Sequence, residues 1–120
     1  MEITPLIQKI KAHPQSAKLG MILCHVGVVR DTSRNGRPVS GLDLTVEHQE
    51  LESILAEQKK RPGIVEILAQ VQEGSLKVGD EMMVLVVGGD LRDHVIPVLS
   101  DTLTAIKKHV TRKTEHLILK

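Results

Sequence analysis

Residues 81–89 read EMMVLVVGG, and this run decides how the rest of the chain can be arranged. Hydrophobic side chains follow one another from Met82 to Val87 without alternation, which predicts a central strand buried on both faces. The apolar residues that follow recur with a period of 3.6, which predicts a long helix. These residues are Val95, Val98, Leu99, Thr102, Leu103, Ile106 and Val110. Asp90 precedes them and is predicted to cap this helix. Pro97 lacks a backbone donor and predicts a kink or a late start of this helix.

The other segments come in pairs of strands separated by helices. Besides the long helix, we expect an N-terminal helix with Thr4 as its N-cap and a second helix over 47–61. Strands are expected over 20–30, 39–46 and 64–73, with a short strand over 117–119. The first two strands are predicted to form a hairpin or meander, with a bulge or a close backbone approach at Gly27. Residues 74–80 are predicted to be a loop. The order favours an α+β fold with a mainly antiparallel sheet and flanking helices.

The composition excludes several function classes. The 120 residues include no Phe, Trp or Tyr, so the chain has no stacking platform for nucleic acid and no aromatic belt for a membrane. No apolar run approaches the ~18 residues that would span a bilayer. We therefore expect a single domain over residues 1–120 with an aliphatic core, and neither a nucleic acid nor a membrane as partner.

Cysteine and histidine usage points away from metal or thiol chemistry. Cys24 is the only cysteine and cannot form an internal disulfide, so a reducing, cytoplasmic setting is expected. Cys24 and His25 are neighbours, but neighbouring residues of a strand point to opposite faces. We expect a buried cysteine there rather than a nucleophile and its base. The six histidines have no metal-ligand spacing, and no metal site is expected.

Cations gather near the C-terminus of the chain. In residues 107–120, five Lys or Arg side chains stand against one Glu, while the chain as a whole has a net charge of +1. This segment is either a local anion site or a solvated helix end whose lysines favour the helix dipole. Residues 88–90, at a strand-to-helix junction, could bind an anion or form only a tight turn. Arg92 beside them is either a ligand contact or an ordinary surface arginine.

Four stretches in a fixed order resemble the large, catalytic subunit of molybdopterin synthase, the MoaE family. They are residues 20–31, which contain Val-Gly-Val-Val-Arg-Asp, residues 41–47 (GLDLTVE), residues 74–80 (GSLKVGD), and Arg92 followed by a long helix that ends Ala105-Ile-Lys107. The resemblance extends from about Thr4 to Glu115 without large insertions.

The resemblance implies an α/β-hammerhead fold and a homodimer. It also implies a small ubiquitin-like partner whose C-terminal Gly-Gly tail carries a thiocarboxylate. The family moves that sulfur onto a cyclic pyranopterin monophosphate and makes the dithiolene that later holds molybdenum. Arginine forks suit the substrate's phosphate, and a lysine in a pocket can act as acid, base or covalent attachment point. Neither a metal nor another cofactor is implied for the transfer itself.

Carried over residue by residue, the resemblance assigns the chemistry to Lys107. Arg30 and Arg92 would hold phosphate or pterin, with Arg92 contributed across the dimer. The family's second active-site lysine falls at Thr114, one residue after Lys113. Either the local register shifts so that Lys113 serves as this lysine, with Thr114 as a substrate contact, or the lysine is lost.

Two other readings stay open. Leu91 stands where the family has a histidine before Arg92, and the family's tyrosines and tryptophan are missing. These departures favour a non-catalytic, dimeric MoaE-like module that binds a pterin, another anion or a protein partner. The third reading is an unrelated α+β domain that shares only the pattern.

Overall fold

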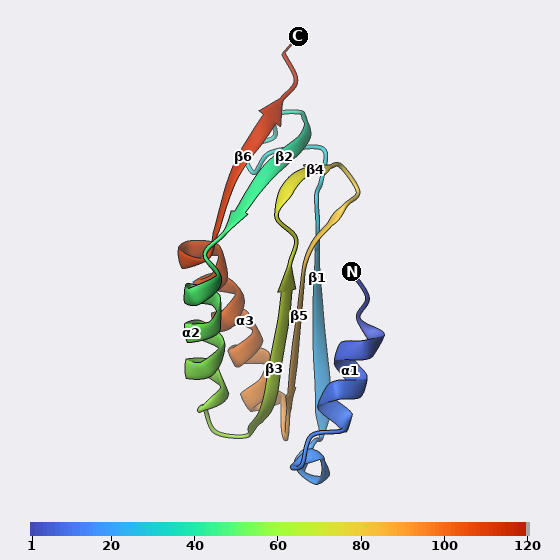
Figure 1. The fold of residues 1–120 in the computed structure, drawn as a ribbon, viewed down its shortest axis with the longest axis vertical. Coiled ribbons are helices and arrows are strands. Elements are labelled where there is room, and N and C mark those ends of the chain that lie inside the picture. Colours follow the sequence, from blue (N-terminus) through green and yellow to red (C-terminus); the bar gives the residue numbers. More distant parts are fainter. Residues whose placement is uncertain (120) are drawn as a thin grey trace.

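Two three-stranded antiparallel sheets follow one another along an elongated molecule (Figure 1). The computed structural model describes residues 1–119 and has principal extents of 55 × 24 × 24 Å. The larger sheet has the order β1-β5-β3 and the smaller sheet the order β4-β2-β6. This architecture is the α+β fold with mainly antiparallel pairing that the sequence predicts.

The run at 81–89 forms strand β5 (Glu81–Gly89) in the middle of the larger sheet. β1 (Met21–Val28) and β3 (Ile64–Val71) pair with it on either side, both antiparallel. Residues 84–87 have no solvent exposure, which confirms the prediction of a central strand buried on both faces. The predicted bulge at Gly27 is also present, as a register shift between Gly27 and Val28.

Helices cover both faces of the larger sheet. Leu85 and Val87 pack against α2 (His48–Lys59) and α3 (Arg92–His109), in a cluster that includes Leu51, Leu55, Val95, Val98 and Ile106. Val84 and Val86 point to the other face and pack against Leu6 and Ile10 of α1 (Thr4–Lys11). A short 3-10 helix (Ser16–Lys18) connects α1 to β1. Alternate residues of one strand therefore hold the three layers together.

The smaller sheet corrects the predicted hairpin. β2 (Val39–Val46) does not pair with β1 but lies between β4 (Gly74–Lys77) and β6 (Thr111–Leu117). β1 contributes side chains to both hydrophobic clusters of the larger sheet, whereas β2 alternates buried and exposed residues. A strand with one apolar face fits a sheet with one face open to solvent, and β2 joins such a sheet.

Two further expectations about this sheet were wrong. Part of the predicted loop at 74–80 is strand β4, because Leu76 is buried against Leu42 and Leu44. β4 can approach closely because position 41 is a glycine, where a Cβ would lie 2.2 Å from the carbonyl oxygen of Leu76. The final strand runs from Thr111 to Leu117 instead of covering residues 117–119.

The helix starts also differ from the prediction. Thr4 is the first residue of α1, and the N-cap is Ile3. At α3 the N-cap is Leu91, and the Asp90 carboxylate accepts a hydrogen bond from the Leu91 backbone N–H at 2.6 Å. Pro97 lies inside α3, which starts before it at Arg92.

We expect Leu85→Ala to lower the free energy of unfolding by about 2–5 kcal/mol, because it leaves a cavity in the central strand. The matched control is Leu119→Ala, since Leu119 is 92% exposed and Leu85 is 0% exposed. Urea denaturation of both variants measures the difference. A loss for Leu85→Ala no larger than that for the control would contradict the central role of β5.

Candidate functional site

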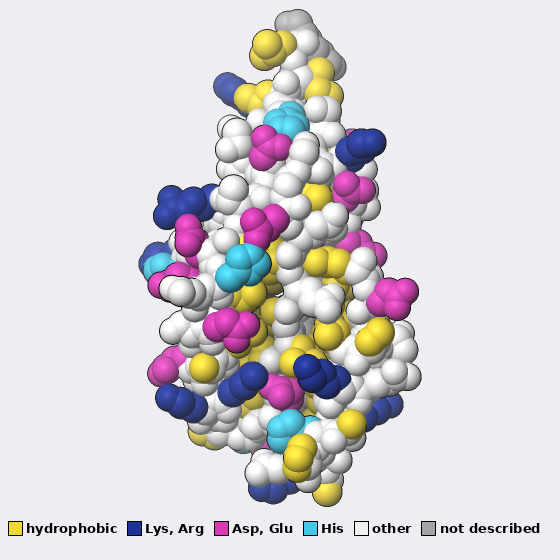
Figure 2. Space-filling model, in the orientation of Figure 1, with side chains coloured by type: hydrophobic (Ala, Val, Ile, Leu, Met, Phe, Trp, Pro, Cys, Tyr) yellow, Lys and Arg dark blue, Asp and Glu magenta, His cyan; other side chains and the backbone are white. Residues whose placement is uncertain are grey.

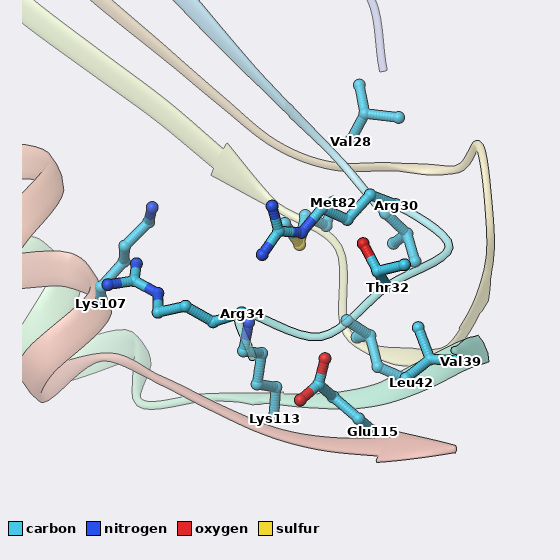
Figure 3. Close-up of a pocket in the computed structure, with 11 residues that line it drawn as sticks. Val28, Arg30, Thr32, Arg34, Val39, Leu42, Met82, Lys107, Lys113 and Glu115 are labelled. Carbon is cyan, nitrogen blue, oxygen red and sulfur yellow. The ribbon is translucent and has the colours of Figure 1, made fainter. Parts of the chain in front are cut away.

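A cavity opens where the two sheets meet, at the C-terminal end of α3 (Figure 3). Two adjoining hollows of about 440 and 370 Å³ share five lining residues. The shared residues are Arg34, Met82, Lys107, Lys113 and Glu115. Arg30 and Thr32 line the first hollow, and Leu44, Val71 and Met83 line the second. Volumes of this size suit a small organic ligand.

The register of β6 brings Lys113 into the cavity. Lys113 lies opposite Leu44 in β2, and Glu115 lies opposite Leu42. Leu42 and Leu44 are both 4% exposed and form the inner face of the smaller sheet. Because directly opposite residues of an antiparallel pair share a face, Lys113 and Glu115 point inward.

Thr114 is not brought to the cavity. It lies opposite Asp43, an exposed residue of β2, and therefore points to the outer face. On that face the Asp43 carboxylate accepts a hydrogen bond from the His116 ring, which lowers the pKa of Asp43. Of the two positions considered from the sequence for the second lysine, the cavity contains Lys113.

Lys107 reaches the cavity from the last turn of α3. Val110 ends this helix with no solvent exposure, and its N–H donates to the carbonyl oxygen of Ile106 at 2.9 Å. The Val110 carbonyl accepts the backbone N–H of Glu47 at 2.8 Å, which ties the start of α2 to the same corner. β6 begins at the next residue, so this fixed corner sets Lys107 and Lys113 on one cavity.

Arg30 follows β1 at a point where the backbone is held on both sides. Val29 is 2% exposed, and its N–H donates to the carbonyl oxygen of Asp80 at 2.9 Å. The Val29 carbonyl accepts the N–H of Gly79 at 2.7 Å. The loop before β5 thereby anchors the chain next to Arg30, whose side chain is free to extend over the cavity (Figure 3).

Cations dominate the lining of this cavity. Arg30, Arg34, Lys107 and Lys113 stand against one carboxylate, that of Glu115. Within residues 1–119, the ion pairs with N···O distances up to 4.0 Å involve other residues than these four cations. The face drawn in Figure 2 shows a different arrangement, with Lys and Arg interspersed among Asp and Glu. Four unpaired cations around one hollow attract an anionic ligand.

Arg92 lies away from this cavity. It begins α3, while Lys107 is in the last turn, and fifteen residues of helix rise by about 22 Å. Arg92 therefore does not reach the cavity of its own chain. The expectation that a second copy contributes it stays a prediction.

The junction at residues 88–90 forms a tight turn. The N–H of Asp90 donates to the carbonyl oxygen of Gly63 at 2.9 Å, and a Cβ at Gly89 would lie 2.6 Å from that oxygen. The Asp90 carboxylate already accepts the Leu91 N–H and bonds His94 Nδ1 at 2.7 Å, which lowers the pKa of Asp90. These contacts occupy the N–H groups of Asp90 and Leu91 and place a carboxylate at the junction, and they favour the tight turn.

Two charged lining residues were not among the predicted site residues. Arg34 belongs to the loop between β1 and β2 and lines both hollows. Glu115 was treated only as a counter-charge near the C-terminus. Alternation with Lys113 would have indicated Glu115 if the strand had been predicted at 111–117. Arg34 gave no signal beyond its position in a turn.

Cys24 and His25 point to opposite faces of β1, as predicted. Cys24 packs with the α1 cluster, whereas His25 lies opposite Leu85, which belongs to the α3 cluster. Burial lowers the pKa of His25, and the positive charge of Lys107 lowers it further. Burial raises the pKa of the Cys24 thiol. The two residues therefore do not form a nucleophile and its base.

The structure contains no helix within residues 1–119 that is long and apolar enough to cross a membrane. The same part of the chain holds no group of three or more His, Cys, Asp or Glu residues arranged to bind a metal ion.

The lowered pKa of His25 predicts a pH effect on stability. The folded state disfavours the protonated ring, so this contribution is complete above about pH 6.5 and is lost as the pH falls through the folded pKa. When the pH falls from about 7.5 to about 5.5, the free energy of unfolding should decrease less for His25→Gln than for the wild type. Urea denaturation at both pH values measures this, with His109→Gln as the matched control. Equal losses for His25→Gln and wild type would contradict the assignment.

Comparisons with known proteins agree with this fold. The family described as MoaE protein matches residues 2–109. The molybdopterin cofactor biosynthesis protein E of Burkholderia multivorans is 24% identical, with a TM-score of 0.76 over 98% of this chain and 84% of its own. The molybdopterin synthase of Staphylococcus aureus is 20% identical, with a TM-score of 0.73 over 86% of this chain and 78% of its own.

A third structure, a complex of subunits 1 and 2 of molybdopterin-converting factor from Helicobacter pylori, is 18% identical. Its TM-score is 0.71, over 100% of this chain and 82% of its own. The comparison with curated proteins gave no significant match. Structural likeness at these identities shows the fold, and the family match covers most of the sequence. The chain belongs to the MoaE protein family.

Proposed function

We propose that this chain is the large subunit of a molybdopterin synthase and works in molybdenum cofactor biosynthesis. It takes sulfur from the C-terminal thiocarboxylate of a small ubiquitin-like partner and transfers it to cyclic pyranopterin monophosphate. Membership of the MoaE family supports this function. The single observation that carries it is the cavity shared by Lys107, Lys113 and Arg30.

Each cation has a role that its chemistry suits. Arg30 binds the substrate's phosphate through its planar fork of donors. Lys107 and Lys113 approach from a helix and a strand, so they flank a ligand held between the two sheets. A lysine in this position can exchange a proton with the substrate or hold it covalently. Arg92 acts in the cavity of a second copy, within a homodimer.

The partner's tail also suits the cavity. A Gly-Gly tail has no side chains and can enter a narrow hollow as an extended chain. Its terminal thiocarboxylate is an anion, which the surrounding cations attract. The complex of subunits 1 and 2 of the Helicobacter pylori molybdopterin-converting factor supports a two-subunit assembly of this kind. We propose that the present chain acts as a single domain over residues 1–120, in the cytoplasm.

The alternative is a non-catalytic module of the same fold. Leu91 stands in place of the family's histidine, and it is 58% exposed beside Arg92. A module that keeps the cations would bind the pterin monophosphate or the partner without forming product. Binding and product formation must therefore be measured separately.

The test is reconstitution with a thiocarboxylated small partner and cyclic pyranopterin monophosphate. We expect the wild type to form the dithiolene product and Lys107→Ala to abolish it. Lys113→Ala should reduce product formation by about a hundredfold or more, since loss of a group that acts in proton transfer costs roughly 10²–10⁴-fold. Product is quantified after conversion to a fluorescent pterin derivative.

Thr114→Ala and Lys60→Ala are the matched controls. Thr114 is the next residue on β6 but points to the outer face, and Lys60 follows α2 with its side chain 77% exposed. Both variants should retain wild-type turnover. A folded wild type that binds the partner and yields no product would support the non-catalytic module. Loss of product in Thr114→Ala but not in Lys113→Ala would overturn the assignment of Lys113.

A further inference from the structure

Arg34 is a cavity cation to which the MoaE resemblance gives no role. It lines the two hollows described above and a third of about 430 Å³ on the outer side of α3. The third hollow contains Lys107, Lys108, Ser100 and Thr104. Arg34 and Lys107 are the residues that line all three. The Arg34 side chain therefore lies at the boundary between the inner cavity and the outer groove.

The close-up shows how Arg34 reaches this boundary. Its side chain extends from the loop between β1 and β2 toward α3, and its guanidinium lies near Lys107 (Figure 3). Lys113 extends from β6, below the Arg34 side chain in this view (Figure 3). A guanidinium next to an ammonium is repelled unless an anion separates the two charges. The arrangement thus leaves a place for an anionic group between Arg34 and the two lysines.

Hydrogen bonds hold the loop that presents Arg34. Ser33 is 7% exposed, and its backbone N–H donates to the carbonyl oxygen of Arg37 at 2.8 Å. The Ser33 hydroxyl oxygen accepts the N–H of Arg37 at 3.0 Å, and the Ser33 carbonyl accepts the N–H of Gly36 at 3.0 Å. Gly36 has φ of 85°, a conformation that suits glycine.

Thr32 and Pro38 form a β-bridge at the base of the same loop. The backbone on both sides of Arg34 is therefore fixed before a ligand binds. Pre-organisation of this kind lowers the entropy lost on binding. Arg37 lies in the same loop but lines a different hollow, with Pro38 and residues 117–119.

We propose that Arg34 is a substrate-binding residue that holds the phosphate of the bound pterin from the loop side, opposite Lys107 and Lys113. It closes the mouth of the cavity between the smaller sheet and α3. The proposal rests on the proposed function for the identity of the substrate. Its physical content is that the phosphate ester bound by Arg30 also contacts Arg34, which supplies a second fork of two donors, while Lys107 and Lys113 lie on the opposite side.

Binding is measured with two probes, inorganic phosphate and cyclic pyranopterin monophosphate, at low salt. Isothermal titration calorimetry gives the affinity for both probes, since neither inorganic phosphate nor this chain, which has no Trp or Tyr, provides a fluorescence signal. We expect Arg34→Ala to lower the affinity for both ligands by about tenfold or more, because charge-assisted hydrogen bonds are strong. Arg34→Lys should recover only part of the affinity, since an ammonium keeps the charge and loses the fork.

Arg37→Ala is the matched control, with the same change in charge in the same loop, and should bind both probes as the wild type does. Circular dichroism and thermal melting verify that each variant is folded. A pterin lacking the phosphate should bind wild type and Arg34→Ala equally. Wild-type affinity of Arg34→Ala for both probes, or an equal loss in Arg37→Ala, would overturn the proposal.

Turnover separates this proposal from the proposed function. If the wild type forms no product but phosphate affinity still depends on Arg34, the synthase function fails and the assignment of Arg34 stands. If the wild type forms product and Arg34→Ala has an unchanged KM for the pterin, the synthase function stands and Arg34 is not a substrate contact.

Discussion

The antiparallel pairing of β6 with β2 is the interaction on which the candidate site depends. It places Lys113 opposite Leu44 and Thr114 opposite Asp43, so it decides which side chain enters the cavity. A shift of the register by one residue would turn Thr114 inward and Lys113 outward. Leu42 and Leu44 are buried against Val29 and Leu76, which fixes the inward face of β2. The buried and hydrogen-bonded Val110 lies directly before β6 and fixes the point at which that strand begins.

The larger sheet fixes the other half of the site. β5 is buried by helices on both faces and sets the position of β1, which precedes Arg30, and of α3, whose last turn carries Lys107. Val110 then joins α3 to β6 at a buried corner that also holds the start of α2. Cations from three separate segments thus meet at the boundary between the two sheets. The rigid elements around them support a pre-organised anion site.

Most of the fold could be predicted from the sequence because its hydrophobic periodicity is strong. The central strand at 81–89, the long helix with its stripe from Val95 to Val110, and the alternating strand at 39–46 were all predicted and confirmed. The pairing of strands was harder to predict, because periodicity gives the faces of a strand and not its neighbours. The first two strands are adjacent in sequence but belong to different sheets.

The site was predicted less completely, for a physical reason. Segment 111–117 did not appear as a strand because its inward-facing positions carry Lys113 and Glu115 rather than apolar residues. The charged residues that line the cavity thus interrupt the apolar alternation by which strands are identified. Lys107 and Arg30 were selected by family resemblance, and the structure brings them together with Lys113. Arg34 could not be selected, because only the folded loop directs its side chain toward α3.

The central claim is that Lys107 and Lys113 contact one bound phosphate ester in a single cavity. Lysine acetylation followed by mass spectrometry, with and without cyclic pyranopterin monophosphate, tests this most directly. We predict that the ligand slows modification of Lys107 and Lys113 together, while Lys60 is modified at the same rate in both samples. Protection of only one of the two cavity lysines, or equal protection of Lys60, would contradict the account.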